Sequence, residues 1–396
     1  MKQIAVVQFY FYPDISAVSQ LLGDLLCTLA EDEEYNITVY CATSDYAKMR
    51  DQRDNRFDNL NIVRIKTTNI GRKSFLSRII DYTGFYISAF TRLFLGRKWH
   101  AVISMSSPPL IAFPVSIALL FRKIPFIYYI EDLFPEILFD MSYLKHPWLI
   151  RKLQALNKVV MRRANSIITI EEDMSRKVIT NYPKARDKTV EIPNWSRGVE
   201  YLPASESKEF TILYSGNMGL AHDFSMLEPL IEELLPLKNI CYQFIGGGTR
   251  VEEIRNIFTK SGETRIEFRG YTSRHIHGAT LAQADLFIIS QTKETVGDLL
   301  PSKLYSYLAA GRPMLFLGPR YSEIGRIITD NDFGIVVEHR EDVSTARRYI
   351  EFLKKDHLRA RLINERIDRY SKLHFGLKKS VEYFRHTIEE NSRKAG

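Results

Sequence analysis

The sequence lacks the residues and motifs on which several large protein classes depend. Its 396 residues include only three cysteines, at positions 27, 41 and 241, with no CxxC or CxxH spacing. Isolated thiols in apolar stretches are typical of buried cysteines in a reducing compartment, not of a disulfide framework or a zinc site. HExxH, GxSxG, P-loop and GxGxxG motifs are missing as well, which argues against zinc proteases, α/β-hydrolases, P-loop NTPases and dinucleotide dehydrogenases. We expect no metal site.

Long hydrophobic runs are absent too. The first apolar run, residues 4–7, is too short for a signal peptide and predicts a strand. The longest stretch without a charge, residues 101–121, is broken by Ser106–Pro109, which leaves about a dozen apolar residues against the roughly 20 that span a bilayer. The sequence therefore predicts a cytoplasmic protein without a transmembrane helix.

The length and the alternation of apolar strands with helical patterns predict two α/β domains. A chain of 396 residues exceeds the size at which one core stops growing, roughly 250 to 300 residues. Six short β-rich runs in each half, separated by helical patterns, are typical of two parallel sheets covered by helices on both faces. The runs are residues 4–10, 37–41, 62–66, 101–105, 126–130 and 166–170, then 211–214, 242–245, 266–268, 286–289, 314–317 and 334–337.

A stretch with two prolines and a glycine, residues 193–207, marks the expected linker between these domains. We therefore assign residues 1–200 to an N-terminal Rossmann-like domain and residues 208–374 to a C-terminal one. Apolar residues with helical spacing continue over residues 368–390, and we expect the C-terminal helix, residues 375–396, to pack back on the first domain.

The most specific local pattern is a helix sequence at residues 301–313, PSKLYSYLAAGRP. Pro301 suits a first helical turn, and Gly311 followed by Pro313 ends the helix. Because the first turn leaves backbone N–H groups unpaired and carries the positive end of the helix dipole, Ser302 and Lys303 there predict a diphosphate site. An ordinary capped helix with a solvated lysine is the alternative.

Turns after other predicted strands offer further candidates, because open α/β sheets bind ligands beyond the carboxyl ends of their strands. The YSGNMG turn at 214–219 would let a phosphate approach the backbone, whereas a plain tight turn is favoured for 246–248. Ser16, at a helix start, would admit a donor phosphate or an acceptor. Glu131 and Asp132 follow a buried strand, where a general base or a sugar-hydroxyl acceptor is wanted, although Asp132 also suits a helix cap.

The net charge of +8 has a local concentration at residues 72–99, where six basic residues face one acid and seven aromatic residues are interleaved. This composition predicts docking on the inner membrane surface. A buried helix with a solvated basic face is the alternative. No recognised nucleic-acid module is present, so we expect no nucleic-acid partner. The basic residues are Arg72, Lys73, Arg78, Arg92, Arg97 and Lys98.

Taken together and in order, these motifs resemble the family-4 glycosyltransferases of GT-B fold, especially the subgroup of bacterial surface-polysaccharide assembly. The resemblance covers nearly the whole chain: YPDISA (12–17), SSPPL (106–110), EDLFPE (131–136), IPNW (192–195), YSGNMG (214–219), FRGY (268–271) and PSKLYSYLAAGRP (301–313). It implies two Rossmann-like domains facing each other across a cleft, the first for the acceptor and the second for a nucleotide-sugar. The implied reaction is a retaining, metal-independent hexosyl or N-acetylhexosaminyl transfer to a lipid-linked or other saccharide, with no cofactor besides the co-substrate.

The resemblance also implies roles for individual residues. Glu131 or Asp132 would lie against the transferred sugar, and Lys303 would stabilise the departing diphosphate. The predicted donor-binding residues comprise Ser16, from the helix start described above, and a set that the resemblance implies. The implied residues are Gly216, Asn217, Gly219, His222, Arg269, Gly270, Tyr271, Asp298, Pro301, Ser302 and Ser306.

Two departures from the family pattern qualify this assignment. Asp298 and Ser306 replace a pair of glutamates, and His222 stands where relatives often have a basic residue, for which it would substitute only partly. The departures leave a catalytically silent GT-B binding subunit as one alternative. A nucleotide-sugar epimerase, which shares the two-domain architecture, is the other.

Overall fold

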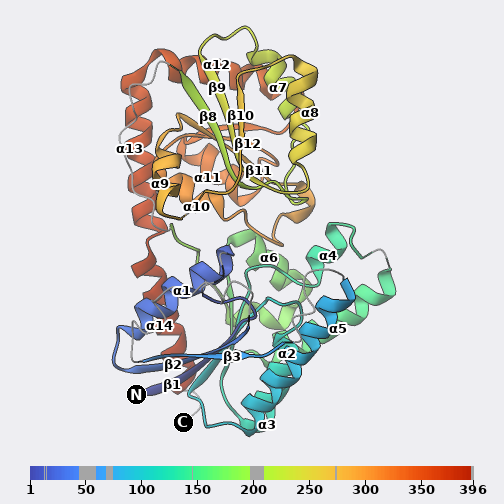
Figure 1. The fold of residues 1–396 in the computed structure, drawn as a ribbon. Coiled ribbons are helices and arrows are strands. Elements are labelled where there is room, and N and C mark those ends of the chain that lie inside the picture. Colours follow the sequence, from blue (N-terminus) through green and yellow to red (C-terminus); the bar gives the residue numbers. More distant parts are fainter. Residues whose placement is uncertain are drawn as a thin grey trace. The chain divides into compact units, whose positions relative to one another are not determined.

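The computed structural model describes residues 1–12, 14, 16–43, 59–67, 75–144, 146–196, 209–272 and 274–393, without the side chains of residues 75–79, 274 and 275. It divides into two compact units (Figure 1). Unit 1 comprises Met1–Asn194, Gly297–Leu300 and Leu377–Gly396, and unit 2 comprises Trp195–Val296 and Pro301–Gly376. The predicted C-terminal domain, residues 208–374, thus includes a short segment, Gly297–Leu300, that the structure counts with unit 1. The predicted linker lies mostly outside the described residues.

Unit 1 is built on a parallel sheet of seven described strands in the order β3-β2-β1-β4-β5-β6-β7. The strands are β1 (Lys2–Val7), β2 (Tyr35–Ala42), β3 (Leu60–Ile65), β4 (Ala101–Met105), β5 (Phe126–Tyr129), β6 (Ser166–Thr169) and β7 (Thr189–Glu191). Those in the middle of the sheet, such as β4 and β5, are buried along their whole length, as expected for a sheet covered on both faces. The short strand β7 was not predicted.

Helices cover both faces of this sheet (Figure 1). Helix α1 (Ala17–Ala30) packs beside α14 (Leu377–Arg393) on one face, whereas α2 (Phe75–Leu95), α3 (Ala112–Arg122) and α5 (Pro147–Arg163) form a layer on the other. Helices α4 (Glu136–Asp140), α6 (Glu172–Asn181) and the 3₁₀ helix η2 (Pro183–Lys188) complete the unit. Helix α14 is held here by hydrogen bonds such as Asn391 Nδ2 to the Ser166 hydroxyl, 2.8 Å.

Unit 2 has a parallel sheet of six described strands in the order β10-β9-β8-β11-β12-β13. They are β8 (Phe210–Asn217), β9 (Ile240–Gly247), β10 (Ile266–Arg269), β11 (Leu286–Ser290), β12 (Met314–Leu317) and β13 (Gly334–Val337). All described strand pairs in both sheets are parallel, so the prediction of two parallel α/β sheets is confirmed.

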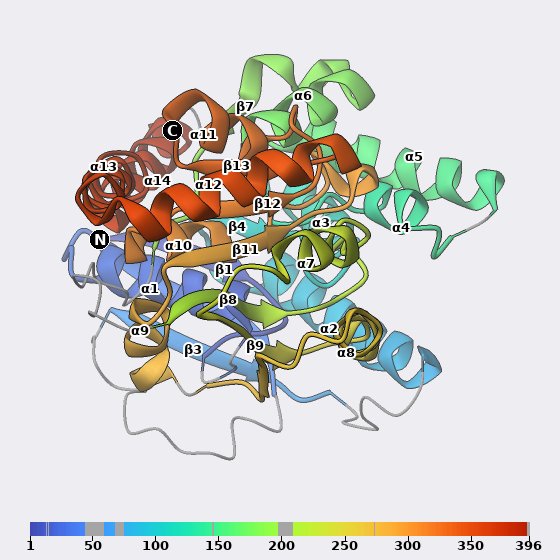
Figure 2. The ribbon, with the colours of Figure 1, turned by 90° about the horizontal axis from the view of Figure 1, so that it is seen from above.

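The helices of unit 2 connect and cover its strands. They are α7 (Leu227–Leu234), α8 (Val251–Ser261), α9 (Arg274–Ala282), α10 (Lys303–Ala310), α11 (Glu323–Asn331), α12 (Val343–Lys355) and α13 (His357–His374), with 3₁₀ turns at Lys293–Thr295 and Arg340–Asp342. Helix α7 packs against both α8 and α12, and Figure 2 shows α7 and α8 side by side. The C-terminal helix predicted over residues 368–390 is two helices, because α13 ends at His374 and α14 begins at Leu377.

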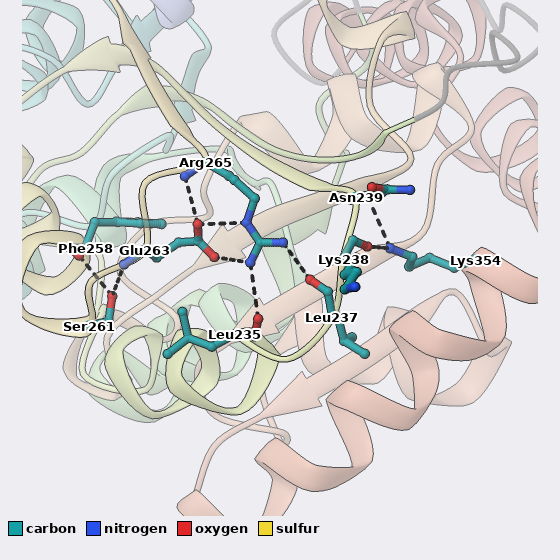
Figure 3. A network of polar contacts seen from close by, with 9 residues as sticks. All are labelled: Leu235, Leu237, Lys238, Asn239, Phe258, Ser261, Glu263, Arg265 and Lys354. Carbon is teal, nitrogen blue, oxygen red and sulfur yellow. Dashed lines mark hydrogen bonds and ion pairs between the residues drawn. The ribbon is translucent and has the colours of Figure 1, made fainter.

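A polar network fixes the chain at the amino ends of the unit 2 strands (Figure 3). Arg265 pairs with the buried carboxylate of Glu263, with Nε 2.8 Å from Oε1, and also donates to the carbonyl oxygen of Leu237 at 2.6 Å. Lys354 of α12 donates to the carbonyl oxygen of Asn239 at 3.1 Å. Burial opposes the ionisation of Glu263, but the hydrogen bonds from Arg265 outweigh it and hold the pKa of Glu263 below its ordinary value.

The structure bears on two further predictions, the burial of the cysteines and the lack of a transmembrane helix. No disulfide joins the cysteines, but only Cys41 is buried, whereas Cys27 and Cys241 are half-buried. Among the helices that the structure describes, none combines the length and the apolar character needed to cross a bilayer.

Candidate active site

The predicted diphosphate site lies at the start of helix α10. The helix begins at Lys303 and ends at Gly311, whose left-handed φ of 64° matches the predicted stop. Pro301 is buried, and Ser302 occupies the N-cap position, exposed and without a capping hydrogen bond from its side chain. The backbone N–H of Leu304 donates to the carbonyl oxygen of Pro301 at 3.1 Å. Because no side chain caps the first turn, its other N–H groups and the positive end of the dipole remain available to an anion.

The ammonium group of Lys303 is held by neutral groups only. Its Nζ donates to the Tyr214 hydroxyl, lies 3.3 Å from the carbonyl oxygen of Asn217 and 3.3 Å from Nε2 of His222, and sits 4.0 Å from the centroid of the Tyr214 ring. None of these described contacts is a carboxylate, so the positive charge is not compensated. Burial lowers the pKa of Lys303 well below its ordinary value. A bound diphosphate would favour the charged form and reverse this shift.

His222 supports Lys303 as a neutral acceptor. Its Nδ1 lies 2.7 Å from the carbonyl oxygen of Ser290, and since a carbonyl oxygen only accepts, Nδ1 carries the proton and Nε2 accepts from Lys303. Burial, followed by the charge of Lys303, lowers the pKa of His222 to about 3. The imidazole therefore supplies no positive charge at neutral pH, and it does not substitute for a basic residue in the way the sequence suggested.

The predicted glycine turn is the end of a strand. Gly216 and Asn217 close strand β8 and pair in register with Gly246 and Gly247 of β9. A Cβ on Gly216, whose φ is 130°, would lie 3.3 Å from Cε of Lys303, and a Cβ on Gly246, whose φ is 129°, would lie 2.0 Å from the carbonyl oxygen of Gly216. Both positions therefore need glycine, and together they leave open backbone beside Lys303.

The FRGY turn contributes one side chain to the same surface. Tyr271 is 67% exposed, and its hydroxyl donates to the carbonyl oxygen of Gly247 at 3.3 Å. Arg269 instead pairs with Glu267, with its Nε 2.5 Å from Oε1, and both side chains are exposed. A Cβ on Gly270 would meet open space. The structure thus brings Tyr271 to the glycine backbone and leaves Arg269 engaged with an acid.

Asp298 and the serines of α10 are in different units. Asp298 is fully buried in unit 1, where its Oδ1 lies 2.6 Å from Nζ of Lys177, which also lies 2.7 Å from Oδ2 of Asp140. Ser302 and Ser306 belong to unit 2, exposed and half-buried respectively. The role of Asp298 in this geometry is an ion pair with helix α6, and donor contact by its carboxylate stays a prediction.

In unit 1 the predicted acids follow strand β5. Glu131 is buried, and its Oε2 accepts from Asn194 Nδ2 at 2.9 Å, while Asn194 Oδ1 accepts from the Tyr129 hydroxyl at 2.8 Å. The Ser106 hydroxyl oxygen accepts from the backbone N–H groups of both Glu131 and Asp132, at 3.1 and 3.2 Å. These contacts fix the direction in which the two carboxyl groups leave the strand.

The two carboxyl groups are poised to hold a proton. Burial raises the pKa of Glu131, and burial together with the nearby charge of Glu131 raises the pKa of Asp132 to about 7. Asp132 does not cap helix α4, whose N-cap is Pro135 without a capping side chain. A carboxyl group with a pKa near neutrality suits proton exchange with a hydroxyl group.

Two remaining predicted site residues, Ser16 and Gly219, make local contacts within the chain. The Ser16 hydroxyl caps α1 by accepting from the Ser19 N–H at 3.4 Å. The backbone of Gly219 lies against the side chain of Asn217, since a Cβ at position 219 would be 2.6 Å from Asn217 Nδ2. Within the described part of either unit taken alone, no three histidine, cysteine or carboxylate ligands gather to hold a metal ion.

Sequence reasoning missed three of the groups that build these surfaces. Tyr214 holds Lys303, the turn at 246–248 was taken as plain, and Asn194 orients Glu131. The turn at 246–248 could have been found from its run of three glycines directly after a strand. Asn194 could have been found from its place in the IPNW motif.

Comparisons with known proteins find glycosyltransferases of similar sequence and solved structures of similar fold. No protein-family model matches the chain. It is 24% identical to the probable glycosyltransferase WbjE of Pseudomonas aeruginosa over 66% of the chain and 68% of that protein. It is also 24% identical to the putative colanic acid biosynthesis glycosyl transferase WcaI of Escherichia coli K12, over 44% of the chain and less than half, 45%, of WcaI.

Among solved structures, Anabaena HepE in complex with UDP superimposes with a TM-score of 0.70 at 12% identity, over 98% of this chain and all of that one. HepE has also been crystallised with UDP-glucose. The fold of this chain is GT-B, and the resemblance to bacterial GT-B glycosyltransferases read from its motifs is confirmed.

Proposed function

We propose that this protein is a glycosyltransferase that binds a nucleotide-sugar on unit 2 and transfers the sugar to a saccharide acceptor in cell-surface polysaccharide biosynthesis. The observation that carries the proposal is the ammonium group of Lys303, which has no carboxylate among its described contacts and sits at the uncapped start of α10 beside the glycine backbone of β8 and β9. HepE, which shares the fold, has been crystallised with UDP and with UDP-glucose, which supports a nucleotide-sugar as the ligand here.

In the proposed reaction, Lys303 and the N–H groups of the first turn of α10 stabilise the negative charge of the departing diphosphate, a role that in other enzymes a metal ion fills. Ser302 lies at the same helix start and adds a hydroxyl donor. We propose that the transfer is retaining and needs no metal ion, and that the sugar is a hexose or an N-acetylhexosamine.

The acids of unit 1 serve the sugar and the acceptor in this proposal. Asp132, whose pKa of about 7 lets it exchange a proton at neutral pH, accepts the proton of an acceptor hydroxyl group. Glu131, oriented by Asn194, accepts hydrogen bonds from sugar hydroxyl groups. We propose a lipid-linked saccharide as the acceptor, with the enzyme at the inner surface of the cell membrane.

The test is a transfer assay. Purified protein is mixed with membranes that carry lipid-linked acceptors and with a panel of radiolabelled nucleotide-sugars, with and without EDTA. A labelled glycolipid, formed equally in EDTA, is the expected result. No product with any donor, together with no heat of UDP binding in calorimetry, would refute the proposal, and an altered free sugar formed without acceptor would indicate an epimerase.

A further inference from the structure

Helix α5 carries five basic residues and no acidic one. Its apolar side packs into unit 1 through residues that include Ile150, Val160 and Met161. The opposite side is exposed, and its residues are spaced by one, three or four positions, so they share one face of the helix. We call these residues the α5 face: Trp148, Arg151, Lys152, Ala155, Lys158, Val159 and Arg162.

The cations of the α5 face have no acidic partner within the described protein. Arg151, Lys152, Lys158 and Arg162 form no ion pair with any described residue. Arg163, in contrast, turns inward and donates to the carbonyl oxygen of Leu119 at 3.1 Å. Four cations without ion pairs therefore lie along one side of a helix that has no acidic residue of its own.

Exposed aromatic residues occur at the amino-terminal end of this face and shortly before it in the chain. Trp148 is 58% exposed, with Lys152 Nζ 5.1 Å from its ring centroid. Phe139, 46% exposed, lies in α4, and Tyr143, 59% exposed, lies in the connection from α4 to α5. Figures 1 and 2 both show α4 and α5 at the outer margin of unit 1. An apolar tip next to a row of cations is not explained by the packing of the unit.

We propose that the α5 face docks the protein on an anionic lipid bilayer, with the cations against lipid phosphates and Trp148, Tyr143 and Phe139 in the headgroup region. This inference rests on the proposed function in one respect, namely that a lipid-linked acceptor lies in a membrane. The 17 residues of α5 provide a docking line about 25 Å long. Amphipathic Trp and Tyr rings favour the membrane–water interface, and basic residues are attracted by anionic lipids.

A nucleic acid is the less suitable polyanion. Binding of a single strand depends on aromatic rings placed along the path of the backbone, so that successive bases stack between the phosphate contacts. Here the rings lie at one end and the cations follow, which suits insertion of a tip into a surface rather than tracking of a strand.

The predicted docking segment, residues 72–99, stays a second prediction beside the α5 face. Arg72 and Lys73 lie outside the described residues, as does the side chain of Arg78. Phe85 and Trp99 are buried in the unit, whereas Ile80, Ile87 and Leu95 are at least half exposed. Its three described cations, Arg92, Arg97 and Lys98, are exposed. Arg97 also has its Nη2 2.6 Å from the Thr38 hydroxyl and its guanidinium over the Trp99 ring.

Tryptophan fluorescence gives a direct test with the whole chain. Of the three tryptophans, Trp99 and Trp195 are buried and only Trp148 is exposed, so a change on membrane contact reports Trp148. Vesicles of phosphatidylglycerol and phosphatidylethanolamine should shift the emission to shorter wavelength and bind the protein in sedimentation. Purely zwitterionic phosphatidylcholine vesicles should do neither.

The charge variant is Arg151→Gln with Lys152→Gln. Because each basic residue near an anionic surface contributes about fivefold to partitioning, the double variant should bind roughly 25-fold more weakly. Its control is Lys260→Gln with Lys355→Gln, two exposed cations of unit 2 whose loss changes the net charge equally and should leave binding almost unchanged. UDP binding by calorimetry should be the same in both variants, which separates docking from the donor site.

Four results would overturn the proposal. One is vesicle binding without a change in Trp148 fluorescence. Another is vesicle binding that survives the α5 substitutions but is lost in Arg92→Gln with Lys98→Gln. The third is an absence of vesicle binding. The fourth is binding of single-stranded RNA homopolymer that the α5 variant loses while it still binds vesicles.

Discussion

Replacing Lys303 with alanine should weaken UDP binding more than any other single change in unit 2. The ammonium group has no carboxylate among its described contacts, so a diphosphate is the anion that completes its surroundings. A hydrogen bond to a charged group contributes about 1.5–3 kcal/mol, and about 1.4 kcal/mol corresponds to tenfold. We therefore expect the Kd for UDP to rise roughly ten- to a hundredfold, measured by titration calorimetry at low ionic strength.

Proton linkage gives the same prediction a second signature. Burial holds the pKa of Lys303 below its ordinary value in the empty site, and a bound diphosphate should raise it. UDP binding at mildly alkaline pH should therefore take up protons, so the observed enthalpy should vary with the ionisation enthalpy of the buffer. In Lys303→Ala this dependence should be smaller.

The variant should fold, because removing a half-buried cation with a lowered pKa relieves a desolvation cost. A lysine with a lowered folded-state pKa opposes folding at neutral pH, and this opposition fades as pH rises. Unfolding midpoints of wild type and Lys303→Ala, measured without UDP, should be equal or higher in the variant. The matched control is Lys260→Ala, an exposed lysine of α8. Unchanged UDP affinity in Lys303→Ala, or an equal loss in the control, would contradict the assignment of the diphosphate site.

Three further predictions concern neighbouring groups. His222→Leu removes the acceptor that favours the charged form of Lys303, so the alkaline fall in UDP affinity should begin at lower pH than in wild type, as calorimetry across a pH series would show. Asp132 becomes the proposed base as pH rises through its pKa of about 7, so kcat/KM should increase over that range in wild type and lose this limb in Asp132→Asn. Arg265→Leu leaves the buried Glu263 carboxylate unpaired and should lower the free energy of unfolding in urea by about 1.5–3 kcal/mol; as pH falls and Glu263 is protonated, this difference should shrink.

The sequence was sufficient for the sheets because their signal is local. Runs such as those of β4 and β5 are apolar throughout, and helical patterns between them require parallel connections. Helix α10 was equally predictable, since Gly311 and Pro313 define its end. Strand β7, with three half-buried or exposed residues, lacks such a run and depends on its pairing with β6.

The site was less predictable because its contacts join residues distant in sequence. Lys303 is positioned by Tyr214 and His222, more than 80 residues before it, and no local pattern reports that distance. Asp298 was placed by its spacing from the helix, yet its partner is Lys177, far earlier in the chain. The spacing of residues in the sequence predicts which side chains are neighbours on one helix. Contacts with residues distant in sequence decide the direction in which a side chain such as that of Asp298 points.

A serine at position 306 adds no negative charge to the helix that carries Lys303. On helix α10 the two residues are three apart, the spacing at which a carboxylate and an ammonium group reach each other. The glutamate expected from the family pattern at this position would share that positive charge in the empty protein. With Ser306 the ammonium group has only neutral partners, at a cost in stability that a bound diphosphate would remove. In the proposed donor site, the serine that would weaken a ribose contact therefore leaves Lys303 to interact with the phosphates.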